Sequence, residues 1–328
     1  MRRIAVIGGG TGLAVLLRGI KNIEDVDLTA IVSVADDGGS SGVLREDLGM
    51  LPPGDIRSCL LALASEEEGM QEILAYRFSE GRLSGQNIGN LIIAALNEIH
   101  GSFDEAIERL SDILKVKGKV VPVSVDKMVL CGELENGNII IGESKIPQIS
   151  LRENSRIVDV FLESGDVGAT RSALHAIKEA DAVIIGPGSL YTSILPNFLV
   201  KGIPEAIRAS KGIKVYICNV MTQPGETDGM SVTGHTEELC RFTEGMAPDF
   251  VIANDRGLTV EELEKYTESA SEQTLVTEAD ESALGAMGIS LVRGPFIETR
   301  KGYVRHDARA VAKVIAGLID GRASLGVG

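Results

Sequence analysis

A pattern that occurs five times is the strongest constraint on the fold of this chain: a short, continuous apolar run followed at once by a loop of Gly, Ser, Thr, Asp or Asn. Continuous β-branched runs are typical of strands buried on both faces of a parallel sheet, and in this chain they alternate with helical patterns. We therefore predict an α/β fold, with a Rossmann-like, mostly parallel sheet and helices on both faces. Ligands of such sheets bind outside the carboxyl ends of the strands, so the loops should line one crevice. The segments are "RIAVIGGGTG", "DLTAIVSVADDGGSSG", "ADAVIIGPGSLYTS", "KVYICNVMTQPGETDG" and "DFVIANDRG".

One segment departs from this pattern. In "KVVPVSVDKMVLCGELENGNIIIGESKI", two alternating apolar runs flank "ENGN", a sequence typical of a hairpin turn. We predict a small antiparallel β insertion at about residues 119–147. The 328 residues lie between the usual lengths of one and two domains, and we expect residues 1–328 to form a single domain around this insertion.

Composition excludes several classes of protein. The net charge of −15 disfavours long-range attraction to nucleic acid, and no run approaches the ~18 apolar residues of a membrane span. The N-terminus lacks a signal-peptide pattern, so we expect a cytoplasmic protein. The four cysteines and four histidines show no metal-ligand spacing, so no metal site is predicted from them. A homodimer is compatible with the sequence, although nothing in it demonstrates an interface.

The first loop is a candidate anion-binding site formed by Gly9, Gly10, Thr11 and Gly12. Read from Gly8, the dinucleotide fingerprint G-x-G-x-x-G fails at its last position, which is Leu13. The physical requirements for binding phosphate remain, because glycines let the backbone approach an anion and the following helix directs its positive end at it. The alternative is that the glycines only form a tight turn.

The second loop carries two adjacent carboxylates, Asp36 and Asp37. Asp36 follows Gly12 by 36 − 12 = 24 residues, close to the spacing of about 20 at which an acidic residue binds a ribose in NAD-binding proteins. The pair could instead hold a divalent cation such as Mg²⁺, and either carboxylate could act as a base. A plain turn would also explain two neighbouring aspartates.

Two helix starts add polar candidates. In "LPPGDIRSCLLAL", Asp55 is predicted to cap a helix, and Arg57 in its first turn opposes the helix dipole, which indicates another task such as binding phosphate. In "LSGQNIGNLIIAAL", Asn87 and Asn90 are predicted to form part of a polar pocket wall. If the protein is an enzyme, Asp37 and Asp55 are the candidate catalytic residues.

The later loops supply further candidates. Gly188 and Ser189 follow the third run, and Asn219, Thr222 and Gln223 follow the fourth. Each loop is a plausible site for phosphate or sugar. None of them contains a nucleophile elbow or a Ser–His–Asp arrangement.

Together these motifs resemble the gluconeogenesis-factor family, the YvcK-like branch of the CofD-like superfamily. The residues that carry the resemblance span Ile4 to Asp307: "IGGGTGL", "VSVADDGGSSG", "LPPGDIR", "SGQNIGNLIIAAL", "GPGSLYTSILPN", "NVMTQPGETDG" and "RHD". The resemblance implies a cytoplasmic protein that binds UDP-sugars such as UDP-N-acetylglucosamine. It further implies a regulator that links carbon flow to cell-wall precursor supply, and that is needed for cell shape and for growth on gluconeogenic carbon sources.

The family pattern also implies three ligand contacts: Thr11, Tyr266 and Arg305. Thr11 and Arg305 would bind the diphosphate and Tyr266 would stack on uracil or a sugar. A cell-wall precursor enzyme is an expected partner. Two alternatives stay open: a CofD-like phospholactyl-type transferase with a divalent metal, and an NAD-binding oxidoreductase. We favour a regulator without turnover.

Overall fold

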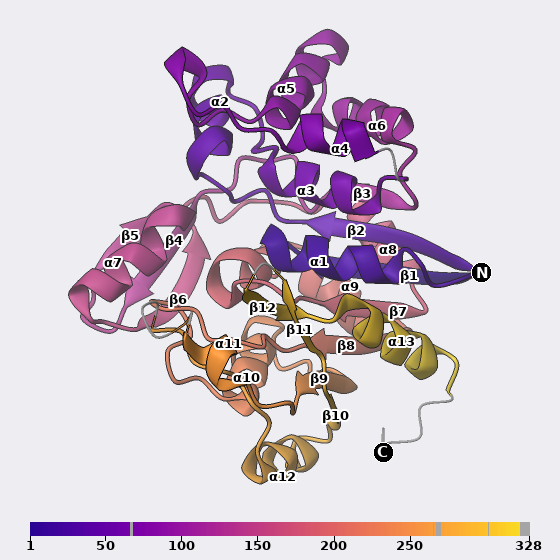
Figure 1. The fold of residues 1–328 in the computed structure, drawn as a ribbon, viewed down its shortest axis with the longest axis vertical. Helices are drawn as coiled ribbons and strands as arrows, with labels where there is room; N and C mark the ends of the chain where they lie inside the picture. Colours follow the sequence, from indigo (N-terminus) through magenta and orange to yellow (C-terminus); the bar gives the residue numbers. More distant parts are fainter. Residues whose placement is uncertain (66–67, 265, 267–269, 301, 322–328) are drawn as a thin grey trace.

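The structure, a computed structural model, describes residues 1–65, 68–264, 266, 270–300 and 302–321. Its centre is a sheet of seven parallel strands in the order β10-β9-β8-β7-β1-β2-β3 (Figure 1). The strands are β1 (Arg2–Gly8), β2 (Val26–Val32), β3 (Lys119–Pro122), β7 (Ala182–Ile185), β8 (Ile213–Ile217), β9 (Phe250–Asn254) and β10 (Ser290–Gly294). The five predicted runs form β1, β2, β7, β8 and β9, so the predicted α/β architecture is confirmed.

Burial of the central strand on both faces explains its continuous apolar run. In β1, Ala5 and Ile7 belong to one hydrophobic core, whereas Ile4 and Val6 belong to another. Successive side chains of a strand point to opposite faces, so the two cores lie on opposite sides of the sheet. Every position of this run must therefore be apolar.

Helices cover both faces, as predicted. Residues of α1 (Gly10–Ile20), α2 (Gly39–Leu48), α3 (Gly54–Leu63), α4 (Glu68–Ala75), α5 (Ile88–His100), α6 (Phe103–Leu114) and α13 (Ala308–Ile319) pack into the core that contains Ile4. Residues of α7 (Ile146–Glu153), α8 (Arg171–Glu179), α9 (Ile203–Ala209), α10 (Val232–Phe242) and α12 (Glu278–Ala286) pack into the other. Helix α11 (Val260–Glu264) and the short turns η1 (Gly81–Leu83), η2 (Glu143–Lys145), η3 (Leu190–Ile194) and η4 (Leu195–Asn197) complete the helical elements of the described residues.

The small antiparallel sheet is present, but its boundaries differ from the predicted 119–147. It has the order β5-β4-β6 and consists of β4 (Leu130–Leu134), β5 (Ile139–Ile141) and β6 (Ile157–Leu162). The "ENGN" turn joins β4 to β5 as predicted. Residues 119–122, expected to begin the insertion, form β3 and pair in parallel with β2 at the edge of the main sheet. The single-domain organisation stays a prediction.

A second addition lies near the C-terminus: the antiparallel hairpin of β11 (Ile297–Arg300) and β12 (Tyr303–His306). It leads directly into α13, which lies beside α1 (Figure 1). Within the described ranges, no helix is long and apolar enough to cross a bilayer.

Close packing of α1 against α13 makes a prediction about Gly19. A Cβ atom at this position would lie 2.0 Å from the carbonyl oxygen of Ala308. Gly19→Ala should therefore lower the free energy of unfolding by about 3 kcal/mol, since backbone has to move to relieve the overlap. Gly285→Ala in α12 is the matched control: nothing lies within 4 Å of its added Cβ, and alanine should gain up to about 1 kcal/mol there. Urea denaturation measures both changes, and equal midpoints would contradict this account of the interface.

Candidate functional site

A cavity of about 350 Å³ lies where the loops after β1, β7 and β8 meet. This volume lies within the range of small-ligand sites. The hairpin β11–β12 and the chain between β9 and α12 close it from the other side. Its lining residues are Gly10, Thr11, Gly12, Pro187, Gly188, Ser189, Ser193, Asn219, Val220, Met221, Thr222, Gln223, Tyr266, Ser271, Val304, Arg305 and His306.

The first loop contacts the third so closely that it requires glycine. A Cβ atom on Gly12 would lie 2.7 Å from the carbonyl oxygen of Pro187, and Gly10 has a φ of +67°. The amide of Asn219 then joins the third loop to the fourth: its Nδ2 donates to the Gly188 carbonyl at 2.7 Å, and its Oδ1 accepts from the Gly188 amide at 3.2 Å. Three strand ends are thereby held as one surface, with the N-terminus of α1 at its centre.

Gln223 brings a buried, unpaired acceptor to this cavity. Its Nε2 donates to Ser189 Oγ at 2.6 Å, whereas its Oε1 is buried without a partner among the described residues. An unpaired buried acceptor is costly, so a ligand N–H that reaches Oε1 would be favoured. The sequence places Gln223 in the right loop but gives no sign of this free acceptor.

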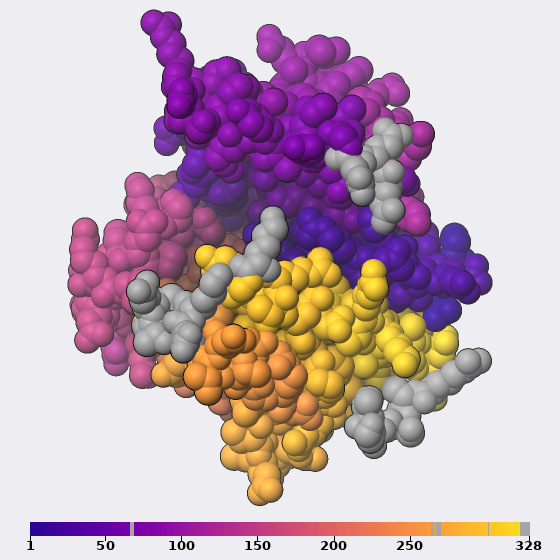
Figure 2. All heavy atoms as spheres, in the orientation of Figure 1, coloured from indigo at the N-terminus to yellow at the C-terminus, as the bar shows by residue number. Residues whose placement is uncertain are grey.

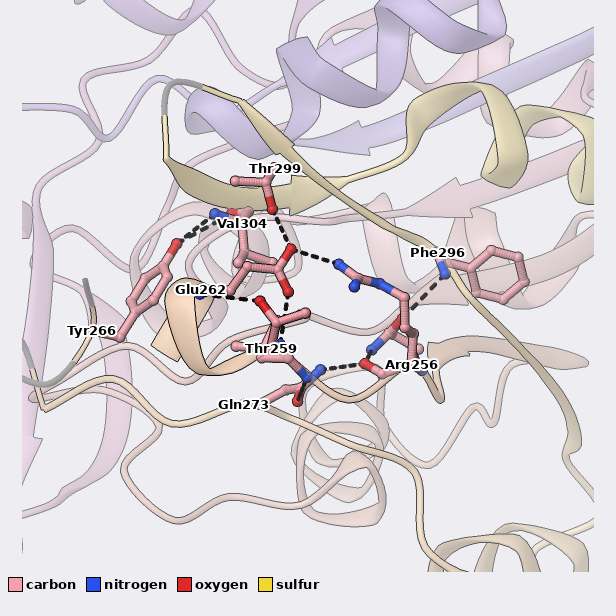
Figure 3. Close-up of polar contacts among 10 residues, drawn as sticks. Arg256, Thr259, Glu262, Tyr266, Gln273, Phe296, Thr299 and Val304 are labelled. Carbon is pink, nitrogen blue, oxygen red and sulfur yellow. Dashed lines mark hydrogen bonds and ion pairs between the residues drawn. The ribbon is translucent and has the colours of Figure 1, made fainter. Parts of the chain in front are cut away.

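Tyr266 and Glu262 attach the chain after β9 to the hairpin (Figure 3). The Tyr266 hydroxyl accepts from the Val304 amide at 2.7 Å. The Glu262 carboxylate accepts from Arg256 at 2.8 Å and also from the hydroxyl of Thr299, and these hydrogen bonds lower its pKa to about 2. Tyr266 therefore lines the cavity and also binds the hairpin β11–β12.

Among the described residues that line the cavity, Arg305 is the cationic side chain. Its guanidinium lies 5.5 Å from the ring centre of Tyr303 and donates to the Val304 carbonyl at 3.0 Å. Within the described part of the chain no carboxylate pairs with it. The neighbouring His306 is buried with its ring nitrogen 3.0 Å from the Cys218 carbonyl; burial lowers its pKa to about 4. It is therefore neutral at pH 7, and Arg305 supplies the charge for an anion.

Six of the predicted ligand-binding residues do not line this cavity: Gly9, Asp36, Asp37, Arg57, Asn87 and Asn90. Arg57 donates to Asn90 Oδ1 at 2.9 Å, and Asn87 caps α5 by accepting from the Asn90 amide at 3.1 Å. Asn90 thus receives a hydrogen bond from the Arg57 guanidinium on its side chain and donates one from its backbone amide to the Asn87 side chain, while Arg57 Nε stays buried without a partner among the described residues.

Asp55 does not cap its own helix, and this prediction is wrong. Helix α3 begins at Gly54 after Pro53, which leaves Asp55 in the first turn. Its Oδ2 instead accepts from the Gly10 amide at 2.7 Å, at the start of α1. Gly9 lies against the same carboxylate. Burial and the nearby charge of Asp36 raise the pKa of Asp55 to about 6.

The remaining carboxylates form an acidic cluster next to Asp55. Asp36 accepts from the Gly38 amide at 2.9 Å, and Asp37 accepts from the Ser144 amide at 2.9 Å. The insertion contributes Glu143, whose pKa rises to about 8 through burial and the negative charges around it. Nothing in the sequence indicated that Glu143 would lie here, since even Asp55 precedes it by 143 − 55 = 88 residues.

A divalent cation at Asp36 and Asp37 is one of the alternatives that the sequence leaves open. Among the residues that the structure describes, no group of three acidic, His or Cys side chains is arranged to hold a metal. Asp36, Asp37 and Asp55 each accept a backbone amide instead. Each of these carboxylates therefore helps to hold a loop in place.

The comparisons with known proteins agree with this fold. The family model described as 2-phospho-L-lactate transferase CofD matches residues 4–297. A relative from Thermoanaerobacterium thermosulfurigenes is 47% identical over 97% of each chain. The Bacillus subtilis protein named gluconeogenesis factor is 42% identical over 97% of this chain and 98% of its own. A crystal structure of a Bacillus halodurans protein, 42% identical, superposes with a TM-score of 0.91 over 96% of this chain and 99% of its own.

These matches define an α/β protein of the CofD type. The chain belongs to the CofD family and, within it, to the gluconeogenesis-factor family. The resemblance expected from the motifs is confirmed.

The acidic cluster makes a prediction about pH. Because the pKa of Glu143 is raised from 4.5 to about 8, the folded protein binds this proton more tightly than the unfolded chain. Its contribution to stability is therefore complete below pH 4.5 and is lost as the pH rises through about 8. Glu143→Gln should raise the free energy of unfolding at pH 8.5 by about 1–3 kcal/mol and should change it little at pH 4.5. Urea denaturation at both values measures this, with Glu133→Gln on β4 as the control; a gain that does not depend on pH would contradict the assignment.

Proposed function

We propose that this protein is a cytoplasmic regulator that binds a UDP-sugar, with UDP-N-acetylglucosamine as the first candidate. The observation that carries the proposal is the cavity at the carboxyl ends of β1, β7 and β8. It brings together residues predicted as ligand contacts from widely separated parts of the chain, and these are Gly10, Thr11, Gly12, Gly188, Ser189, Asn219, Thr222, Tyr266 and Arg305.

The chemistry of the lining suits the parts of such a ligand. The first turn of α1 at Thr11 and Gly12 offers backbone amides and the positive end of a helix to a diphosphate. Arg305 adds a guanidinium that has no carboxylate partner among the described residues. The ring of Tyr266 offers a face for uracil or a sugar, and Gln223 Oε1 could accept an N–H from either.

A regulatory role follows from the relatives' name together with this site. The Bacillus subtilis relative is named gluconeogenesis factor, and a UDP-sugar is a product of carbon flow toward the cell wall. We propose that the ligand reports the supply of cell-wall precursors, that the protein is needed for cell shape and for growth on gluconeogenic carbon sources, and that an enzyme of precursor synthesis is its partner.

A transferase is the second candidate, because the matched family model carries that name and because burial raises the pKa of Asp55 to about 6 beside the first loop, in the range suited to a general base. Asp55 is, however, already bound to the Gly10 amide. The NAD alternative has less support, because Asp36 lies outside the cavity and accepts from the Gly38 amide.

Calorimetric titration with UDP-N-acetylglucosamine tests the proposal, with NAD as the comparison ligand. Arg305→Ala should weaken binding of the UDP-sugar about tenfold or more, because charge-assisted hydrogen bonds to phosphate contribute about 1.5–3 kcal/mol. Arg109→Ala on α6 removes the same charge from an exposed site away from the cavity and should leave the affinity unchanged. Binding of NAD without binding of the UDP-sugar would reject the proposal.

Substitutions of Tyr266 separate its two roles. Tyr266→Phe keeps the ring and loses the hydroxyl that accepts from the Val304 amide, so we expect a twofold to fivefold weaker affinity for the UDP-sugar. Tyr266→Ala also loses the stacking surface and should weaken binding more than tenfold. Equal affinities in the same titration for both variants would show that the ring does not contact the ligand.

A further inference from the structure

A second, larger cavity of about 920 Å³ adjoins the first and shares Thr11 and Arg305 with it. Helix α1 forms one wall, α3 and α4 contribute Leu61 and Gln71, and the hairpin β11–β12 with the start of α13 forms the opposite side. Figure 2 shows this face, where the indigo α1 lies between the purple helices and the yellow C-terminal segment. We call this second cavity the α1 groove.

The α1 groove is basic although the chain as a whole has a charge of −15. The two acidic side chains among its described lining residues are engaged: Glu298 pairs with Arg300 at 2.8 Å, and Asp307 caps α13 by accepting backbone amides. The basic lining residues are Arg18, Lys21, Arg300, Arg305 and Arg309. Among the described lining residues Arg300 pairs with Glu298, whereas Arg18, Arg305 and Arg309 have no carboxylate partner, and these three guanidinium groups leave an excess of positive charge that attracts anions.

Arg18 and Arg309 carry this excess. Neither side chain has an ion pair or hydrogen bond within the described ranges, whereas Arg2, Arg3 and Arg293 each pair with a carboxylate. Burial and the nearby guanidinium of Arg300 lower the pKa of Arg18. Like charges gathered without counter-ions are unfavourable in the free protein, and a bound anion would relieve this cost.

We propose that the α1 groove binds a small molecule with two phosphate groups, a diphosphate or a bisphosphate, held by Arg18, Arg305 and Arg309. Planar guanidinium groups match phosphate oxygens in bidentate geometry, and more than one arginine favours more than one phosphate. Because Arg305 also lines the first cavity, the two ligands compete for its charge, and the two sites are negatively coupled. The coupling rests on the proposed function, but binding of the phosphate compound does not.

Calorimetric titration with inorganic pyrophosphate tests the binding. Arg18→Ala and Arg309→Ala should each weaken it about tenfold, while Arg109→Ala, which changes the net charge equally, should not. Citrate, which carries carboxylates instead of phosphates, tests whether the site selects phosphate. Clearly weaker binding of citrate than of pyrophosphate supports a phosphate site, and equal binding rejects it. Absence of pyrophosphate binding, or an affinity that neither groove variant lowers, overturns the proposal.

A second titration measures the coupling. Saturating pyrophosphate should weaken binding of UDP-N-acetylglucosamine severalfold in the unaltered protein. Arg18 lies outside the first cavity, so the Arg18→Ala variant should have an affinity for the UDP-sugar within about twofold of that of the unaltered protein. In this variant pyrophosphate should have little effect on that affinity. If the protein binds no UDP-sugar but binds pyrophosphate in a way that depends on Arg18, the proposed function is rejected. The proposed site in the α1 groove then stands on its own. Independent binding of both ligands would reject the coupling.

Discussion

The hydrogen bond between the Gly10 amide and the Asp55 carboxylate joins the first loop to helix α3, beside the acidic cluster. It places a buried carboxylate at the start of α1, where a free backbone amide would otherwise face a ligand. The negative charge is stabilised by the helix dipole, yet burial and Asp36 still raise its pKa to about 6. The first loop is therefore fixed before any ligand binds, with Thr11 and Gly12 directed into the cavity.

Charges of opposite sign lie on the two sides of the first loop. On the side of the insertion lie Asp36, Asp37 and Glu143, and the two aspartates raise the proton affinity of Glu143. On the side of the hairpin lie Arg305 and the basic α1 groove. The carboxylates of Asp36 and Asp37 repel an anionic ligand and Arg305 attracts it, so the diphosphate of the proposed nucleotide-sugar would be directed toward Arg305.

The sequence predicted the sheet well because burial on both faces leaves a continuous apolar run, as in β1. It predicted the loops after β1, β7 and β8 because parallel strands place their carboxyl ends together. It failed where a residue's partner is distant in the chain. Asp55 has the local pattern of a helix cap, and its bond to Gly10, 45 residues away, is visible only in three dimensions. For the same reason the contact of Arg57 with Asn90, 33 residues away, is visible only in three dimensions.

Side-chain contacts also indicate how occupancy of the cavity could reach the surface. The chain between β9 and α12 is joined to the hairpin through Glu262 and Tyr266, and α11 on this stretch exposes Val260 and Leu263 by 76% and 47%. Leu258 and Tyr266 of this stretch pack against the small hydrophobic cluster of Val220, Ile297 and Val304. A ligand that touches Thr11, Tyr266 and Arg305 would contact the loop after β1, the chain between β9 and α12, and the hairpin. Its binding would therefore stabilise the association of these three segments. A regulator without turnover needs such a link, because its only output is a change in the surface that a partner meets.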